Sequence, residues 1–199
     1  MAKLQDGKGS GAQARVSSGD NRLHTSATVL TEESSKSIVN SDAFTFNTTD
    51  TADTLTVTTT KGQMLYVENT SPTKVLCVEK IILSSGAAGT RVTLQRNPVV
   101  GTIGANNTHT AVNLNFSSGK TAEATAYNWD ETGTGMTGIT AGTTISSFIL
   151  PAGVFDAPLN GSIVLNKGDS ISITVEAASG TPEFAAFIRA YYLVADDVA

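Results

Sequence analysis

The sequence predicts an all-β protein: an antiparallel β-sandwich, with a jelly roll as the preferred topology, preceded by an extended N-terminal arm. Three observations support this prediction. The 199 residues include 29 threonines and 19 serines, and only 16% of them are charged, a composition that favours strands over helices. Apolar and polar residues alternate with period two through most of the chain. Clusters of Gly, Asn, Asp, Ser and Pro separate the alternating runs at short intervals.

Residues 1–42 form the predicted arm, and residues 43–199 form the predicted sandwich. The arm is punctuated by Gly and Ser, and its few apolar residues have no sustained period. Residues 1–40 carry five basic and four acidic side chains, a charge of +1, against −6 for the remainder. Ordering the arm costs about 1–2 kcal/mol per residue in backbone entropy. Because the apolar side chains are too few to offset that cost, we expect the arm to order by pairing with a neighbouring chain.

Nine runs in the body are predicted to be strands. Val75–Leu83 is apolar on both faces, which is typical of a strand in the middle of a sandwich or interface, and Cys77 within it is expected to be a small buried hydrophobe. The other eight are Phe44–Phe46, Leu55–Val57, Arg91–Arg96, Ala111–Phe116, Thr144–Leu150, Gly161–Leu165, Ser170–Glu176 and Glu183–Val194. With one cysteine in the chain, stability has to come from packing or assembly rather than from an intrachain disulfide.

The single tryptophan, Trp129, lies in the segment Gly119–Thr143, whose Gly, Thr and Ala content predicts a long excursion from the sandwich. Loops of more than about 12–15 residues without internal structure are usually functional or disordered. Two interpretations of Trp129 stay open. It is either a plug packed onto the body or an anchor that contacts a partner, since Trp is enriched at interfaces.

Residues that carry catalysis or bind metals are sparse. The two histidines, His24 and His109, have no carboxylate at ligand spacing and are expected to be solvent-facing loop residues. Asp50 and Asp53 lack the patterned oxygen ligands of an EF-hand, so a turn between strands is favoured over a Ca²⁺ site. We therefore expect no enzymatic activity, no cofactor and no metal.

The charge and hydropathy patterns disfavour two classes of partner. A net charge of −5 lacks the basic footprint of a protein that binds bare nucleic acid. No run of 18 apolar residues predicts a membrane span, and the N-terminus carries no visible export signal. The sequence therefore predicts a soluble protein with neither nucleic acid nor membrane as its partner.

Short motifs along most of the chain resemble those of tailed-bacteriophage virion structural proteins. They are Val67–Ser71, Gln95–Pro98 with Gly101–Thr102, Asn113–Ser118 and Val164–Ile171, together with Leu4–Gly7 and Asn21–Leu23 near the N-terminus. The resemblance implies a β-sandwich body with an N-terminal arm, assembled in the particle as a head decoration (cement) protein or as a tail or fibre component. Nothing in that group requires a catalytic residue.

The expected function is therefore that of a non-enzymatic structural virion protein of a tailed bacteriophage, preferably a capsid decoration or cement protein anchored by its arm. The alternative is a tail, fibre or baseplate-associated protein that binds a receptor or glycan. A homotrimer made in the host cytoplasm and carried in the virion is expected, with the major capsid protein or another virion protein as partner. The residues expected to contact the partner are Arg15, Arg22, Leu23, Leu30 and Trp129.

Overall fold

The structure, a computed structural model, describes two units of the chain, Met1–Thr31 and Glu32–Ala199. The residues it describes are 33, 36–48, 55–103, 107–129 and 135–194, and the backbone of 4–5, 13–16 and 23–24. The first unit contains three short strands in the order β1-β2-β3, paired antiparallel. These are β1 (Leu4–Gln5), β2 (Gln13–Val16) and β3 (Leu23–His24).

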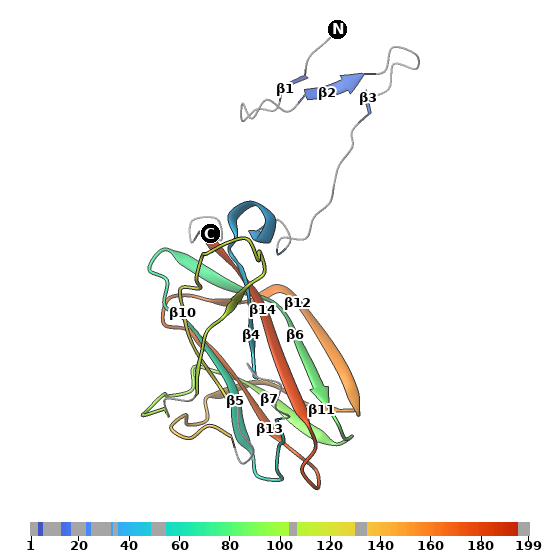
Figure 1. The fold of residues 1–199 in the computed structure, drawn as a ribbon, viewed down its shortest axis with the longest axis vertical. Helices are drawn as coiled ribbons and strands as arrows, with labels where there is room; N and C mark the ends of the chain where they lie inside the picture. The colour runs from blue at the N-terminus through green and yellow to red at the C-terminus, as the bar shows by residue number, and fades with distance from the viewer. Residues whose placement is uncertain are drawn as a thin grey trace. The chain divides into compact units, whose positions relative to one another are not determined.

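The body consists of two antiparallel sheets that pack together (Figure 1), which confirms the predicted all-β sandwich. The six-stranded sheet has the order β11-β7-β13-β5-β10-β8, and the five-stranded sheet has the order β12-β6-β14-β4-β9. A five-residue π-helix, η1 (Lys36–Asn40), precedes the first of these strands. The strands are β4 (Ala43–Asn47), β5 (Gly62–Asn69), β6 (Lys74–Ser85), β7 (Thr90–Arg96), β8 (Thr108–His109), β9 (Val112–Asn113), β10 (Ala124–Asn128), β11 (Thr143–Leu150), β12 (Gly153–Leu165), β13 (Ser170–Glu176) and β14 (Phe184–Val194).

The strand pairing follows the pattern of a jelly roll. Strands β4, β5, β6 and β7 pair with β14, β13, β12 and β11 respectively, as in one long hairpin folded into two sheets. Contacts β14–β6 and β13–β7 then complete each sheet. The short strands β8, β9 and β10 come from the connection between β7 and β11. They extend one edge of each sheet and leave β11 and β12 at the opposite edges.

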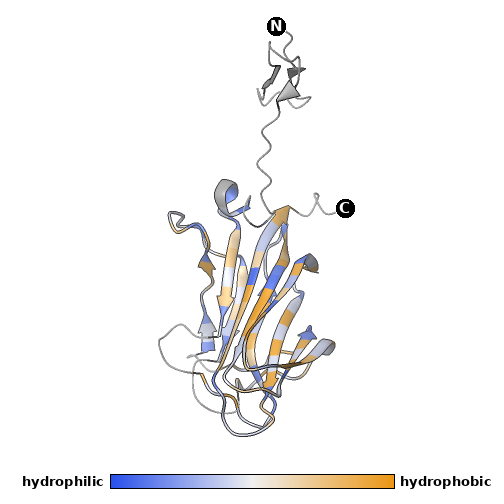
Figure 2. Cartoon of the chain, turned by 90° about the vertical axis from the view of Figure 1, so that its right-hand side faces the viewer, coloured by the Kyte–Doolittle hydropathy of each residue, from blue (hydrophilic) through white to orange (hydrophobic). Residues whose placement is uncertain are grey.

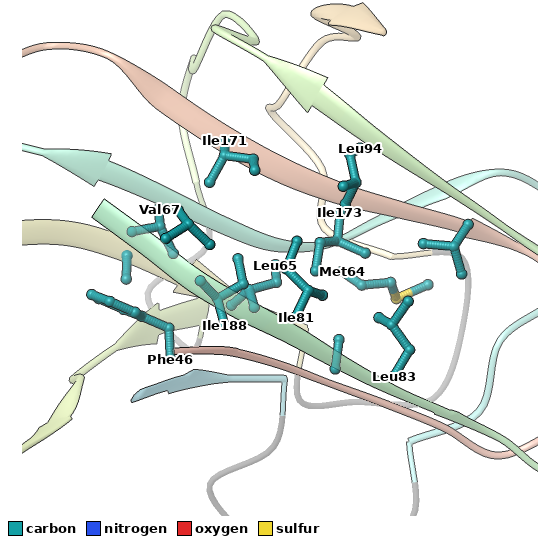
Figure 3. Close-up of a cluster of buried hydrophobic side chains, with 14 of the residues drawn as sticks. Phe46, Met64, Leu65, Val67, Ile81, Leu83, Leu94, Ile171, Ile173 and Ile188 are labelled. Atoms are coloured by element: carbon teal, nitrogen blue, oxygen red, sulfur yellow. The ribbon is translucent and has the colours of Figure 1, made fainter. Parts of the chain in front are cut away.

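The main hydrophobic core lies between the two sheets. Figure 3 shows side chains of the six-stranded sheet, such as Leu65 and Ile173, facing Ile81 and Ile188 of the five-stranded sheet, and all four are fully buried. Hydrophobic and hydrophilic residues alternate along many of the strands (Figure 2), which is the pattern that places one face of each strand in the core.

Strand β6 is apolar on both faces, as predicted. Leu76 faces the main core, whereas Cys77 joins a second buried cluster with Val75 and Tyr191. The expectation that Cys77 is a small buried residue is confirmed, since it is 2% exposed.

The prediction that Gly119–Thr143 is an excursion from the sandwich was wrong. Strand β10, inside this segment, pairs with β5 and with β8. Farther along, Met136 forms a bridge with Gln63, and Ile139 forms one with Val100. Strand β10 contributes mostly small and polar side chains, which explains why its sequence did not indicate a strand. Backbone pairing with β5 and β8 holds it in the sheet.

Two strands were missed or shortened by sequence reasoning. No strand was predicted at Gly62–Asn69, because this strand is buried on both faces and does not alternate. Strand β12 begins at Gly153 rather than at Gly161. It accommodates Pro158 because an edge strand has no ladder bond to lose on its outer side, and its register shifts between Pro158 and Ile163.

Two other predicted strands are shorter than expected. Leu55 and Val57 are buried, as their alternation indicates, but the chain there makes a single bridge, from Thr56 to Glu183, rather than a strand. The predicted strand Ala111–Phe116 contracts to the two residues of β9, after which the chain turns.

Candidate functional site at the base of the arm

The chain enters the body through a tight bend between η1 and β4. The backbone N–H of Asp42 donates to the carbonyl of Lys36 at 3.1 Å, which folds the segment back on itself. Ser41, in the bend, has a φ of 54°, a left-handed conformation that is costly for a residue with a side chain. Such a conformation persists only where surrounding contacts hold it. The contacts of Ser41 therefore decide how firmly the base of the arm is fixed.

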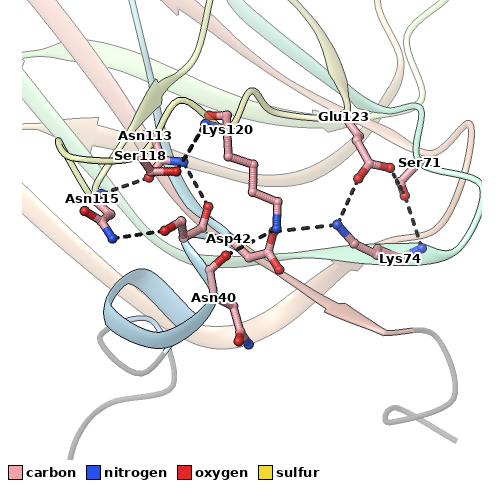
Figure 4. Close-up of polar contacts among 10 residues, drawn as sticks. Asn40, Asp42, Ser71, Lys74, Asn113, Asn115, Ser118, Lys120 and Glu123 are labelled. Atoms are coloured by element: carbon pink, nitrogen blue, oxygen red, sulfur yellow. Dashed lines mark hydrogen bonds and ion pairs between the residues drawn. The ribbon is translucent and has the colours of Figure 1, made fainter.

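Two asparagines hold Ser41: Asn113 at the end of β9 and Asn115 just after it, both labelled in Figure 4. The amide of Asn113 donates to the Ser41 carbonyl at 2.9 Å and to the carbonyl of Lys120 at 3.1 Å. The amide of Asn115 donates to the Ser41 hydroxyl at 3.0 Å. Because both the backbone and the side chain of Ser41 are bound, the bend is attached to the body on two sides.

Alternating charges continue this attachment across the end of the sandwich. The Asp42 carboxylate, whose side chain is 13% exposed, forms ion pairs with Lys120 and with Lys74, the latter at 3.6 Å. Lys74 in turn binds Glu123 at 2.8 Å, and Glu123 accepts a hydrogen bond of 2.6 Å from the Ser71 hydroxyl. We call Asp42, Lys74, Lys120 and Glu123 the charge network. It joins the base of the arm to the β5–β6 turn and to the segment before β10.

The charge network shifts the pKa values of two of its members. Burial opposes the charge on Lys74, but the hydrogen bond to Glu123 and the nearby Asp42 carboxylate outweigh it, so the Lys74 pKa is raised. The hydrogen bonds from Lys74 and Ser71 outweigh desolvation at Glu123, so the Glu123 pKa is lowered. Both shifts favour the ionised forms of Lys74 and Glu123.

Replacement of Asp42 tests the strength of this attachment. Asp42→Ala leaves two lysines without a shared acceptor and is expected to lower the free energy of unfolding of the body by about 1–3 kcal/mol. The matched control is Asp156→Ala, because Asp156 is half-exposed and binds Lys80 at 3.5 Å. An exposed pair of that kind contributes about 0–1 kcal/mol. Urea unfolding of both variants provides the comparison, and equal losses would contradict the proposed role of Asp42.

An apolar groove lies on the other side of the segment that holds Ser41. Residues 112–116 alternate, so that Asn113 and Asn115 bind the bend while Val112, Leu114 and Phe116 line the groove. Phe116 is 88% exposed, an unusual state for a phenylalanine. The groove has a volume of about 380 Å³, and its other lining residues are Thr45, Asn47, Ile82, Phe187 and Arg189.

The structure describes only some of the residues predicted to contact a partner. The backbones of Arg15 and Leu23 lie in β2 and β3, where Arg15 pairs with His24 and Leu23 pairs with Val16. Arg22 and Leu30 lie outside the described residues, as do Asp50 and Asp53, which sequence reasoning assigned to a turn.

Trp129 packs on the body next to the end of β10. Its ring contacts the main core and also a third cluster that contains Tyr66, Met136 and Ile139. Its backbone N–H donates to the carbonyl of Met64 at 2.9 Å. Trp129 thus packs on the body, and the charge network does not include it.

The expectation that His109 faces solvent in a loop was wrong. His109 lies in β8, is 5% exposed, and its Nε2 accepts a hydrogen bond from the backbone N–H of Asn47 at 3.2 Å. It therefore links β8, at the edge of the six-stranded sheet, to β4 of the five-stranded sheet. Within the part of the chain that the structure describes, no cluster of three or more His, Cys, Asp or Glu residues is arranged to hold a metal ion.

Sequence reasoning missed the charge network and the groove. Asp42, Lys74 and the neighbouring pair Lys120 and Glu123 come from three separate parts of the chain, and folding brings them together. The alternation Val112-Asn113-Leu114-Asn115-Phe116 was read as a strand, whereas two of its polar side chains support a bend more than 70 residues away. A useful signal was the pair of asparagines, because short amides commonly bind nearby backbone groups.

Comparisons with known proteins returned no match: no family model matches the chain, and neither a curated protein nor a solved structure matches it. Among the described residues, no helix has the length and apolar character that crossing a bilayer requires.

Proposed function

We propose that this chain is a non-enzymatic structural protein of a tailed-bacteriophage virion, and specifically a capsid decoration or cement protein anchored through its N-terminal arm. The observation that supports this proposal most directly is the attachment of the arm's base. Asn113 and Asn115 bind Ser41, and the charge network binds Asp42. Because its base is held this firmly, the arm can transmit force from its binding partner to the folded body.

The proposed assembly is a homotrimer on the particle, with the major capsid protein or another virion protein as the binding partner of the arm. Cyclic closure would bury sheet edges that otherwise offer unpaired backbone groups. The jelly-roll order of the sheets agrees with this role, since that architecture is common in capsid proteins, although it also occurs in lectins and cupins. The fold supports the proposal, and the fixed base of the arm favours it over a free-standing binding module.

A receptor- or glycan-binding protein of the tail, fibre or baseplate is the second candidate, and one observation favours it. Phe116 stands 88% exposed beside an apolar groove, and an exposed aromatic ring is a common contact for sugars and for protein partners. A Phe116→Ala variant separates the two roles. Under the cement proposal it is incorporated into particles and host adsorption is unchanged, whereas under the receptor proposal adsorption falls.

Purified particles test the proposed function. In gradient-banded particles of the encoding phage, we expect the chain to be present at many copies per particle and to be located by electron microscopy on the head surface. Recovery of the chain only from the soluble fraction of the lysate would contradict a structural role. Location on the tail would contradict the cement assignment and favour the second candidate.

A further inference from the structure

Strand β11 leaves one edge of the six-stranded sheet open. It pairs with β7 on one side and has no partner on the other among the described residues. Its eight residues, Thr143–Leu150, contain neither a charged side chain nor a proline. Ile145 is 46% exposed and Ile149 is 64% exposed. Proteins usually protect a long edge strand with charge, proline or a bulge, because its unpaired N–H and C=O groups accept another strand.

The other sheet edges of the body are protected or short. Strand β12 carries Asp156 and Pro158 and has a register shift between Pro158 and Ile163, so its outer edge cannot offer a continuous ladder. Strands β8 and β9 have two residues each. The register of β11 shifts once, between Thr144 and Ser146, and the remaining five residues pair regularly with β7. Among the described edges of the body, β11 is therefore the one suited to strand addition.

Apolar side chains surround this open edge. The rings of Phe148 on β11 and Phe155 on β12 lie 5.6 Å apart between the two sheet edges, and Phe155 is 38% exposed. Val154, close by on β12, is 72% exposed. A strand added to β11 would cover part of this surface as well as pair its backbone groups, so side-chain burial and hydrogen bonding favour the same contact.

We infer that the edge of β11 receives the N-terminal arm of a second copy of this chain, which adds to the sheet as an extra strand. This inference rests on the proposed assembly role and names the surface that would carry it. The arm's strand β2 alternates Gln13 and Arg15 with Ala14 and Val16, the pattern of a strand with one apolar face. Within its own unit, β2 makes two residue pairs with β1 and two with β3. The edge of β11 offers a longer ladder.

The geometry of the body favours an arm from a neighbouring copy. The arm enters at β4, which pairs with the edge strand β9, and the hydrogen bond from Asn47 of β4 to His109 places this entry near the edge strand β8. Strand β11 lies at the opposite edge, where Phe148 meets Phe155. The 35 residues before η1 reach about 115–125 Å when extended, enough to span to a neighbour. A contact between one edge and the opposite edge of the next copy is head-to-tail. It closes into a ring such as a trimer when the rotation between successive copies completes a circle.

Charge favours the arm over a second β11 edge as the occupant. Residues 1–40 carry a charge of +1, whereas residues 41–199 carry −6. Two bodies that meet edge to edge bring like charges together, but an arm that meets a body brings opposite ones. The net charges of the arm and the body, rather than the uncharged strand β11 itself, therefore favour the arm as the occupant.

Variants that each carry one added cysteine, mixed as purified proteins, test the inference. One protein carries Ala14→Cys or Val16→Cys in the arm, and the other carries Ile149→Cys on β11. The native Cys77 is buried and provides the wild-type background. Under mild oxidation we expect the mixture to form a disulfide-linked dimer of twice 20.6 kDa that contains one copy of each variant. Each variant alone, and a mixture in which Val112→Cys on β9, at the sheet edge remote from β11 and β12, replaces Ile149→Cys, should give at least tenfold less of this species.

Each other outcome overturns the inference. A dimer of Ile149→Cys with itself would show that β11 edges pair with each other, and a dimer of the arm variants with themselves would show that arms pair with arms. No mixed dimer with either arm variant would show that the arm does not reach the edge. Failure of this inference can be told apart from failure of the proposed function. If no mixed dimer forms but the chain still enters particles through its arm, the β11 contact is wrong and the proposed function stands.

Discussion

A protein that lacks residues 1–40 is expected to be absent from assembled particles while its body stays folded. The side chains of the main core all belong to the part of the sequence that runs from β4 to β14, within the second unit of the chain. The deletion therefore removes none of these buried side chains. The segment that the charge network holds would then end in a free terminus, with nothing to bind a partner. Gradient-purified particles assembled with the deleted protein should contain less than about a tenth of the wild-type copy number.

Two controls make this deletion informative. The deleted protein should keep a strand-dominated circular dichroism spectrum and remain soluble, which separates loss of anchoring from loss of folding. Removal of Asp196 and Asp197 at the other end of the chain should leave incorporation unchanged. Within the arm, Arg22→Lys should not fully rescue an Arg22→Ala variant, since lysine lacks the planar fork that binds a carboxylate through two hydrogen bonds. Incorporation at wild-type occupancy without the arm would place the anchor in the body, at the groove beside Phe116 or at Trp129.

Truncation of a core isoleucine is expected to have the largest effect on stability. Ile173 on β13 is fully buried and lies between Leu65 on β5 and Leu94 on β7 in the six-stranded sheet. Ile173→Ala removes buried methyl groups and leaves a cavity that close-packed strands cannot fill, so the free energy of unfolding should fall by about 2–5 kcal/mol.

The same substitution at the surface is the matched control. Ile149 on β11 is 64% exposed, so in dilute, unassembled protein Ile149→Ala should change the free energy of unfolding by less than about 0.5 kcal/mol. Urea denaturation of both variants measures the difference. Similar losses at the two positions would show that β11 is already buried in an assembly under those conditions, or that the sandwich core is not where the structure places it.

The sandwich could be predicted from sequence because its signals are local. The doubly apolar run Val75–Leu83 lies inside its sheet, with Val75, Leu76, Cys77 and Val78 all buried, and that burial appears directly in its composition. The turn Asn166–Asp169 precedes β13 as its residue types indicate, with Gly168 at a φ of 82°. Period-two alternation and turn chemistry act over a few residues, so a single sequence displays them.

The parts that sequence reasoning missed depend on contacts between distant residues. Strand β10 is held by backbone pairing with β5, and nothing in Ala124–Asn128 identifies that partner. His109 looked like a loop residue, but the position of Asn47 on another strand makes it a buried acceptor. The base of the arm likewise depends on Lys120 reaching Asp42 across 78 residues of chain. Such sites are defined by tertiary structure, and a single sequence does not reveal them.

Hydrogen exchange along residues 1–40, measured in the free protein and again in the assembled particle, tests the central claim most directly. If the arm anchors the body by pairing with a neighbouring chain, its amides should exchange fast in dilute free protein and at least a hundredfold more slowly in the particle, while the strands of the sandwich stay protected in both. Equal exchange rates along the arm in the two states would contradict the claim that this protein is anchored through its arm.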